Sequence, residues 1–172
     1  MELRRLNKND GSWTSLVDQW RSQCENYGDE FESYATAALS TLADECDDGT
    51  PAKNSGCFGV WADEERGYVA ACFLTSSPLK GYVGNVLRVR HLTMAPYYDS
   101  EDLDLDVYTD LLTECFMQII EASSTVLPSD HIKVHFQSPF DRNFFSSFAS
   151  SLRHDGTFCK IDVKSMWLYI SK

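Results

Sequence analysis

The most regular hydrophobic pattern of the chain lies between residues 103 and 123. Apolar side chains recur there at three- and four-residue spacing: Val107, Leu111, Leu112, Cys115, Phe116, Ile119 and Ile120. This period of about 3.6 residues predicts an amphipathic helix. Weaker stripes of the same period predict helices over residues 13–26 and 31–46, and a short helix over 144–152.

Short apolar runs rich in β-branched and aromatic residues lie between these helices and predict strands. They cover residues 2–6, 57–62, 68–74, 86–94, 132–136, 158–163 and 166–170. The polar turn 63–67 joins the second and third strands into an antiparallel hairpin. The strand–helix–strand unit over 86–136 needs a right-handed crossover, so its two strands are expected to be parallel. The predicted order is β-α-α-β-β-β-α-β-α-β-β, an α/β domain with a mixed sheet.

Length and composition favour one domain over residues 1–172. The chain is 43% hydrophobic and 13% aromatic, which is enough for a substantial core. No linker or internal repeat interrupts the pattern, so one core is expected.

The charge balance limits the partners that this protein can have. The formal net charge is −11, which argues against binding to a nucleic-acid backbone. An acidic surface either serves solubility alone or attracts cationic partners such as polyamines or a basic protein. No run approaches the roughly 18 apolar residues of a membrane span, and residues 1–6 lack the apolar stretch of a signal peptide. We therefore expect a cytoplasmic protein without membrane contact.

Six cysteines are spread over helix-like and strand-like segments, and none forms a C-x-x-C pair. They are Cys24, Cys46, Cys57, Cys72, Cys115 and Cys159. This spacing predicts buried structural thiols rather than a disulfide framework or a zinc site.

The end of the predicted strand 86–94 carries a short motif, Leu92-Thr93-Met94-Ala95-Pro96, with an aromatic residue, Tyr98, after it. Together with the element order, this segment resembles the GNAT-type N-acetyltransferases, whose fourth strand ends in L-x-V-x-P. The resemblance covers nearly the whole chain in element order, and at residue level it is concentrated in 85–123.

This resemblance implies an acyl-CoA N-acyltransferase fold that uses acetyl-CoA or a related acyl-CoA. The backbone of four residues would hold the pantetheine and thioester: Leu92, Thr93, Met94 and Ala95. The start of the next helix would hold the pyrophosphate, through Leu105, Asp106, Val107 and Tyr108. Asn143 would contribute as a match to an asparagine of the family.

The segment that would be the family's phosphate loop departs from its pattern. Residues 99–106 read Asp-Ser-Glu-Asp-Leu-Asp-Leu-Asp, with five carboxylates, no glycine and no basic residue. Three interpretations stay open: a solvated acidic helix start, a CoA held by other groups or a cationic acceptor at this rim, and a metal loop. Against the metal loop, Val107 replaces the glycine of an EF-hand and Thr113 stands where its glutamate would be, so no metal is expected.

The sequence offers only weak candidates for the general acid and the general base. The position where many family members carry a tyrosine falls on Ser150 or Leu152. His91 is the candidate base, because its ordinary pKa suits proton transfer. Alternation puts Arg88 and Arg90 on the face of Leu92 and Met94. His131 and His135 share a strand face but lie about 13 Å apart, too far to share a metal.

The sequence thus predicts a GNAT-type acyltransferase that moves an acyl group from acyl-CoA to a small-molecule or protein amine by direct attack. The alternative is a catalytically inactive protein of this fold that binds a basic protein partner through its acidic surface. Whether the protein forms a homodimer is left open by the sequence.

Overall fold

A computed structural model shows a mixed α/β protein, and it describes residues 1–99, 105–136, 139–155 and 158–172. The helices are α1 (Ser12–Tyr27), α2 (Phe31–Ala38), α3 (Ser40–Glu45), α4 (Leu105–Ala122) and α5 (Pro139–Asp155), with a 3-10 helix over Pro96–Asp99. The strands are β1 (Glu2–Arg5), β2 (Ser55–Trp61), β3 (Tyr68–Pro78), β4 (Asn85–Met94), β5 (His131–His135), β6 (Lys160–Lys164) and β7 (Trp167–Ser171). The predicted element order is confirmed, with one helix divided in two.

The division falls at Leu39, where φ is −110° and the helical path is interrupted between α2 and α3. Leu39 itself is buried. The apolar stripe over 31–46 continues on both sides of the break, so the periodicity predicted a single helix there. Helix α5, in contrast, is longer than predicted, because it spans Pro139–Asp155 and the prediction was 144–152.

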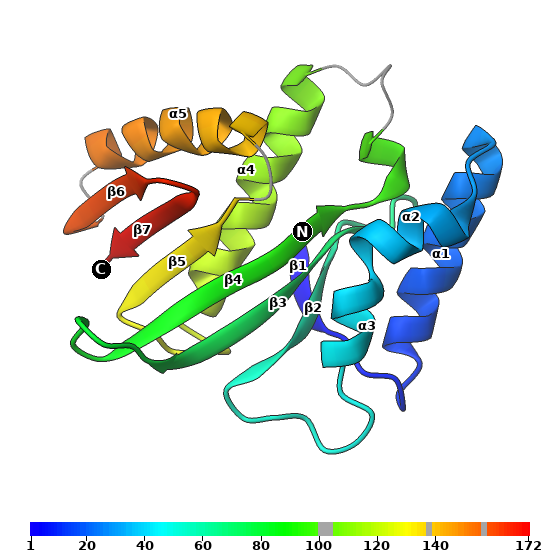
Figure 1. The fold of residues 1–172 in the computed structure, drawn as a ribbon, viewed down its shortest axis with the longest axis horizontal. Coiled ribbons are helices and arrows are strands. Elements are labelled where there is room, and N and C mark those ends of the chain that lie inside the picture. Colours follow the sequence, from blue (N-terminus) through cyan, green and yellow to red (C-terminus); the bar gives the residue numbers. More distant parts are fainter. Residues whose placement is uncertain (100–104, 137–138, 156–157) are drawn as a thin grey trace. The chain divides into compact units, whose positions relative to one another are not determined.

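All seven strands belong to one sheet, in the order β1-β2-β3-β4-β5-β7-β6 (Figure 1). Val86–Val89 of β4 pair with His131–Val134 of β5 in parallel. The predicted parallel βαβ unit is therefore confirmed. Strand β7 inserts between β5 and β6 and pairs antiparallel with both, which leaves β6 at an edge of the sheet.

By their internal contacts the residues form two compact units, Met1–Phe73 with His91–Gln118, and Leu74–Arg90 with Ile119–Lys172. The single domain over 1–172 stays a prediction. No helix within the described ranges is long and apolar enough to cross a membrane.

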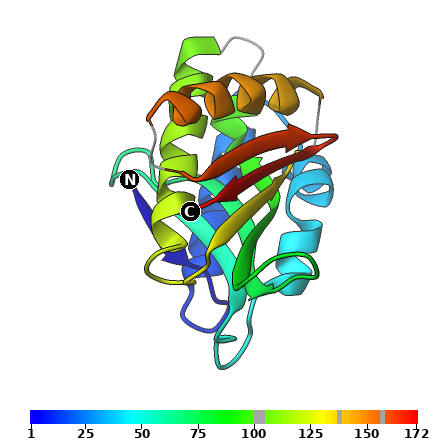
Figure 2. The same ribbon diagram turned by 90° about the vertical axis from the view of Figure 1, so that its left-hand side faces the viewer.

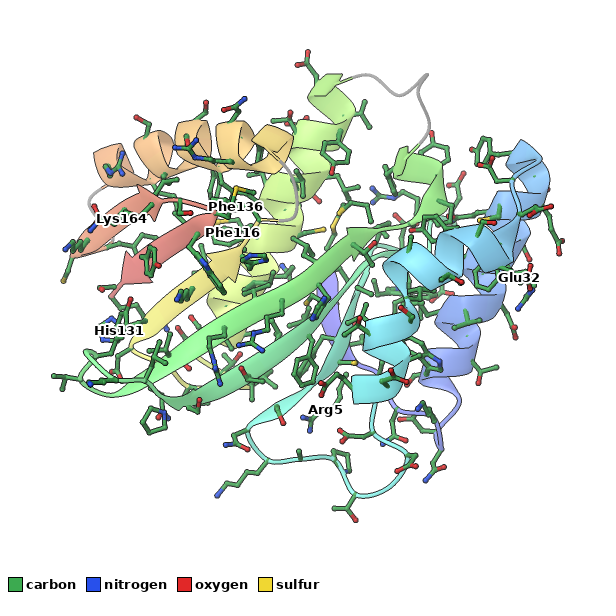
Figure 3. All side chains as sticks on the ribbon, in the orientation of Figure 1. Arg5, Glu32, Phe116, His131, Phe136 and Lys164 are labelled. Carbon is green, nitrogen blue, oxygen red and sulfur yellow. The ribbon has the colours of Figure 1, made fainter. Side chains whose placement is uncertain are left out.

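In the first unit, α1–α3 lie on one side of β1–β3 and α4 lies on the other (Figures 1 and 2). The fully buried Phe116 comes from α4 (Figure 3) and Trp20 from α1. Phe58 of β2 and Leu42 of α3 are also fully buried. The apolar stripe of α4 therefore faces the core from Leu111 to Ile119, whereas Val107 at its start is exposed.

In the second unit, α5 packs on β6 and β7 (Figure 2). The buried Phe136 follows β5, and its ring stacks on that of Phe145 in α5 at 5.0 Å between centroids. Ile161, Leu168 and Ile170 are buried, so alternate positions of β6 and β7 supply this core, as expected for strands with one face covered.

The cysteines behave largely as predicted. All six are free thiols without a disulfide bond; five of them are buried, and Cys159 is exposed. Burial raises the pKa of Cys24, Cys46, Cys57 and Cys72, and it raises that of Cys115 to about 12. A thiol held protonated is a poor nucleophile.

We expect a thiol reagent at pH 8 to modify one cysteine of the native protein quickly, namely Cys159, and all six only after unfolding in guanidinium. Counting modified thiols by mass spectrometry checks this. The variant Cys159→Ser should show no fast phase. Rapid modification of two or more thiols in the native wild-type protein would contradict the burial described above.

Candidate functional site

The site that the sequence predicts starts at the end of β4. The pairing of β4 with β5 covers Val86–Val89, and β4 continues to Met94. His91 has φ +52°, a left-handed backbone that is uncommon for a residue other than glycine. This conformation interrupts the regular alternation of the strand. The assignment of Arg88 and Arg90 to the face of Leu92 and Met94 assumed an unbroken alternation and therefore does not hold.

Two of the backbone groups assigned to the cofactor already have partners in the first unit. The Tyr34 hydroxyl of α2 donates to the Met94 carbonyl. The Ala95 amide donates to the Val69 carbonyl of β3 at 2.9 Å. A carbonyl has a second lone pair, so Met94 can still accept from a ligand, whereas the single N–H of Ala95 is used within the sheet.

Tyr34 is held in place by α1. Its ring packs edge-on against Trp20, with 6.1 Å between ring centroids and 73° between planes. The Trp20 indole is fully buried, and its Nε1 donates to the Tyr68 carbonyl at 2.9 Å. Two aromatic side chains of α1 and α2 thus bind one backbone carbonyl at the start of β3 and one at the end of β4.

Tyr98 occupies the aromatic position after the strand and is buried. Its amide donates to the Ala95 carbonyl at 2.8 Å. Burial raises the pKa of Tyr98, and the nearby Arg66 guanidinium offsets part of that rise. The phenol is therefore protonated at neutral pH. The Tyr97 ring packs against it edge-on, with 4.8 Å between ring centroids.

The other predicted cofactor contacts lie at the start of α4. Leu105 begins the helix, Asp106 and Val107 are exposed, and Tyr108 is half-buried. Asp106 in the first turn suits the helix dipole, but it adds negative charge where a pyrophosphate would bind. Residues 100–104 of the acidic stretch lie outside the described residues.

The residues present therefore fit the two ends of an acyl-CoA unequally. The end of β4 offers a backbone carbonyl to an amide of a pantetheine arm. The start of α4 offers amide groups together with a carboxylate, and the sequence before it adds no basic side chain. A diphosphate at this position would meet like charge.

The two remaining predicted residues belong to different units. His91 is half-buried in the first unit, whereas Asn143 is exposed on α5 of the second unit. Among the described residues, no cluster of side chains could hold a metal ion.

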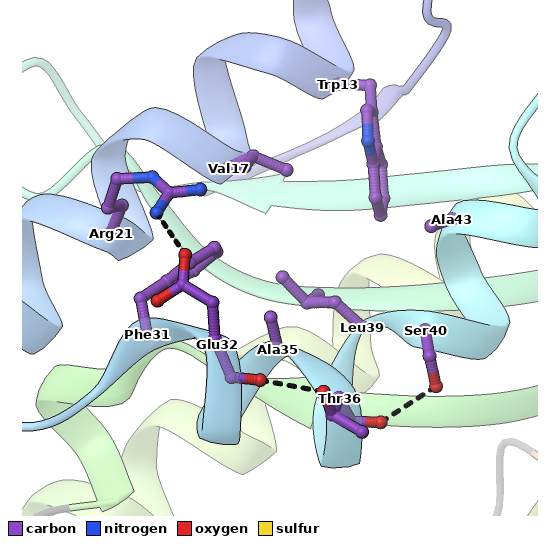
Figure 4. Close-up of a pocket in the computed structure, with 10 residues that line it drawn as sticks. All are labelled: Trp13, Val17, Arg21, Phe31, Glu32, Ala35, Thr36, Leu39, Ser40 and Ala43. Carbon is purple, nitrogen blue, oxygen red and sulfur yellow. Dashed lines mark hydrogen bonds and ion pairs between the residues drawn. The ribbon is translucent and has the colours of Figure 1, made fainter.

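A groove that the sequence did not reveal lies between α1 and the pair α2–α3 (Figure 4). It has a volume of about 410 Å³. Its apolar walls include Trp13, Phe31 and Leu39. At its rim Arg21 binds Glu32 at 2.7 Å and lies 4.3 Å from the centre of the Phe31 ring.

The helices around this groove are strongly acidic. Residues 12–45 contain seven carboxylates, all exposed, and one basic residue, Arg21. Much of the negative charge of the chain is therefore on the surface of one helical layer.

Comparison with known proteins identifies the fold. No protein-family model matches the chain, and no curated protein matches it in sequence. A probable acetyltransferase from Staphylococcus epidermidis ATCC 12228 is similar in structure, with a TM-score of 0.53 and 18% identity over 99% of this chain and 98% of that one.

Two further solved structures match at lower TM-scores. An acyl-CoA N-acyltransferase from Pseudomonas aeruginosa is 10% identical over 99% of this chain and 97% of that one, with a TM-score of 0.38. An aminoglycoside antibiotic 6'-N-acetyltransferase from Acinetobacter haemolyticus is 11% identical over 96% and 95%, with a TM-score of 0.36.

The chain has a GNAT-type acyl-CoA N-acyltransferase fold, which confirms the fold that the sequence predicts.

We expect Tyr34→Phe to lower the free energy of unfolding by about 1–2 kcal/mol, because it removes the hydroxyl that binds the Met94 carbonyl. Tyr27→Phe is the matched control, since Tyr27 is exposed on α1. Denaturant unfolding followed by tryptophan fluorescence measures both. Equal stability of the two variants would mean that the Tyr34 hydroxyl does not hold the end of β4.

Proposed function

We propose that this protein transfers an acyl group from acyl-CoA to a primary amine. The observation that carries the proposal is the acyltransferase fold combined with a strand β4 that runs past the end of its pairing with β5, from Val89 to Met94. This strand end is where the resemblance places the thioester. The proposal rests on fold-level analogy for the reaction and on the residues of this chain for the site.

The residues of the chain would act by binding and positioning. The Met94 carbonyl, fixed by Tyr34, would accept a hydrogen bond from the donor. His91 would take a proton from the attacking amine. The acyl-CoA supplies an activated carbonyl, so that the new C–N bond forms as the C–S bond breaks and the thiol leaves with a proton. A cytoplasmic location stays a prediction.

The Met94→Trp variant tests the placement of the site. A larger ring at this nearly buried position should block the donor and abolish acetyl transfer. The measurement is thiol release from acetyl-CoA with a panel of primary amines, beginning with polyamines. Met94→Leu conserves volume and should keep most of the activity.

Thermal unfolding of both Met94 variants controls for loss of structure, because overpacking costs roughly 1–3 kcal/mol. Full activity in a folded Met94→Trp protein would place the site elsewhere. A wild-type protein that neither binds nor turns over acetyl-CoA would contradict the proposed reaction itself.

A second candidate function follows from the groove between α1 and α2–α3. We propose that it binds a basic, amphipathic helical segment of a partner protein. An apolar side chain of the partner would enter between Trp13 and Leu39, and its lysines or arginines would face the surrounding carboxylates. Charge complementarity selects this occupant, since the helical layer carries seven acids and one base.

Neutralising two of these acids should weaken the binding of a Lys-rich amphipathic peptide several-fold at low salt, with a smaller effect at high salt. The test variant is Asp18→Asn with Asp44→Asn, two exposed residues that follow the groove-lining Val17 and Ala43 in the sequence. Glu64→Gln with Glu65→Gln changes the net charge equally on the turn between β2 and β3. Fluorescence anisotropy of a labelled peptide measures the affinities. Equal weakening by the two double variants would show that net charge, and not this groove, attracts the peptide.

A further inference from the structure

The exposed face of β5, β7 and β6 carries an unusual set of side chains for an acidic protein. The strand register aligns them in three rows: His131, Ser171 and Lys160, then Lys133, Tyr169 and Asp162, then His135, Trp167 and Lys164. The alternate positions Ile161, Leu168 and Ile170 are buried, so the rows form the other face of these strands. This face holds three lysines, two histidines and two large aromatic rings, with a single carboxylate.

The lysines of β6 alone would have an ordinary explanation. Strand β6 is at an edge of the sheet, and lysines on edge strands prevent pairing with other chains. That explanation does not apply to Lys133, which is on β5 inside the sheet. Its Nζ lies 4.0 Å from the centre of the Trp167 ring and 5.0 Å from that of Tyr169. The Lys133 ammonium thus packs on the two rings of β7, on strands other than the edge strand β6.

A cavity of about 540 Å³ opens at one end of this face. Its wall is formed by β6, β7, the start of β5 and the loop before β4. His131 is fixed in it, because Nε2 lies 2.9 Å from the Val83 carbonyl and Nδ1 lies 2.8 Å from the Ser171 hydroxyl (Figure 3 labels His131). A carbonyl can only accept, so Nε2 carries a proton and donates to Val83, while the Ser171 hydroxyl can pair with Nδ1 as donor or acceptor.

The cavity combines rings with positive charge. The Tyr82 ring packs edge-on against His131 with 4.9 Å between centroids, and Tyr169 lines the same cavity. Lys160 and Lys164 both reach the Asp162 carboxylate, at 3.3 and 3.5 Å. Their side chains are 67% and 71% exposed, so each ammonium has donors left for a ligand. Asp162 is the one acid among the described residues that line the cavity.

We propose that this cavity binds a nucleoside phosphate. The phosphates would contact the solvent-facing donors of Lys160 and Lys164 that are not used by Asp162, on a group of two ammonium ions and one carboxylate whose net charge is positive. The base would pack on the rings of Tyr82 and Tyr169, with His131 as the rigid floor between them. The volume suits a ligand of this size. The site lies wholly within the second unit and does not depend on acyl transfer.

The test uses ADP as the probe, with adenosine and inorganic diphosphate as its two halves. Calorimetric titration of the full chain at low salt should show that ADP binds and that each half binds more weakly. The variant Lys160→Ala with Lys164→Ala should weaken ADP binding by about tenfold or more, because it removes both charge-assisted donors. These side chains are exposed, so the fold should tolerate the change. The matched control is Lys8→Ala with Lys53→Ala, which removes two exposed lysines from the other unit.

Chemical-shift mapping then locates the ligand: ADP should perturb the amides of 81–83, 160–164 and 169–171. No ADP binding at millimolar concentration, or equal binding by the double variant and the wild type, would overturn the proposal. Equal affinity for inorganic diphosphate would overturn the role of the rings. Stronger binding of a single-stranded oligonucleotide at the same amides would replace the small ligand with a nucleic acid.

The two proposed sites can be told apart, although CoA itself contains an ADP group. Met94→Trp should lose acetyl transfer and keep the ADP affinity of the wild type. Loss of ADP binding in that variant, with the fold intact, would overturn a separate site in the second unit.

Discussion

The hydrogen bond from the Trp20 indole to the Tyr68 carbonyl is the constraint on which the first unit depends. A buried indole N–H without a partner would cost about 1–3 kcal/mol, so α1 can pack on the sheet only where a carbonyl is available. Tyr34 of α2 then leans on the Trp20 ring and binds the Met94 carbonyl. One buried donor thus ties α1 to β3, and the tyrosine that packs on its ring ties α2 to the end of β4.

Negative and positive side chains are concentrated on different surfaces of this chain, which the net charge alone does not show. The helices of the first unit carry seven carboxylates and one guanidinium over residues 12–45, whereas the face of β5, β7 and β6 carries three lysines and one carboxylate. Exposed charges interact over roughly 10 Å at ordinary salt. A ligand on either surface would meet mainly the charges around it, so a net charge of −11 does not by itself exclude an anion from the face that carries the lysines.

Periodicity predicted the elements that bury one continuous side. The stripe of α4 over 103–123 matches Leu105–Ala122 closely, because most of its apolar residues, from Leu111 to Ile119, are buried. The same reasoning missed the break at Leu39, where both halves of the stripe face the same way. It also predicted an unbroken alternation in β4, which the left-handed His91 interrupts. Few residues other than glycine adopt that conformation, and the alternation of the strand gives no sign of it at His91.

The candidate sites show a second reason why the sequence falls short. Tyr34 and Met94 meet across 60 positions, and in the sequence Tyr34 is only one more aromatic residue on a helix stripe. Likewise, Lys133, Tyr169 and Asp162 share a row only because β7 inserts between β5 and β6. If β6 were next to β5 in the sheet, Asp162 would be on the strand directly beside Lys133. The strand order that separates the carboxylate from this lysine is thus what allows Lys133 to stack on the rings of β7. A surface of this kind is fixed by topology, and residue types alone cannot disclose it.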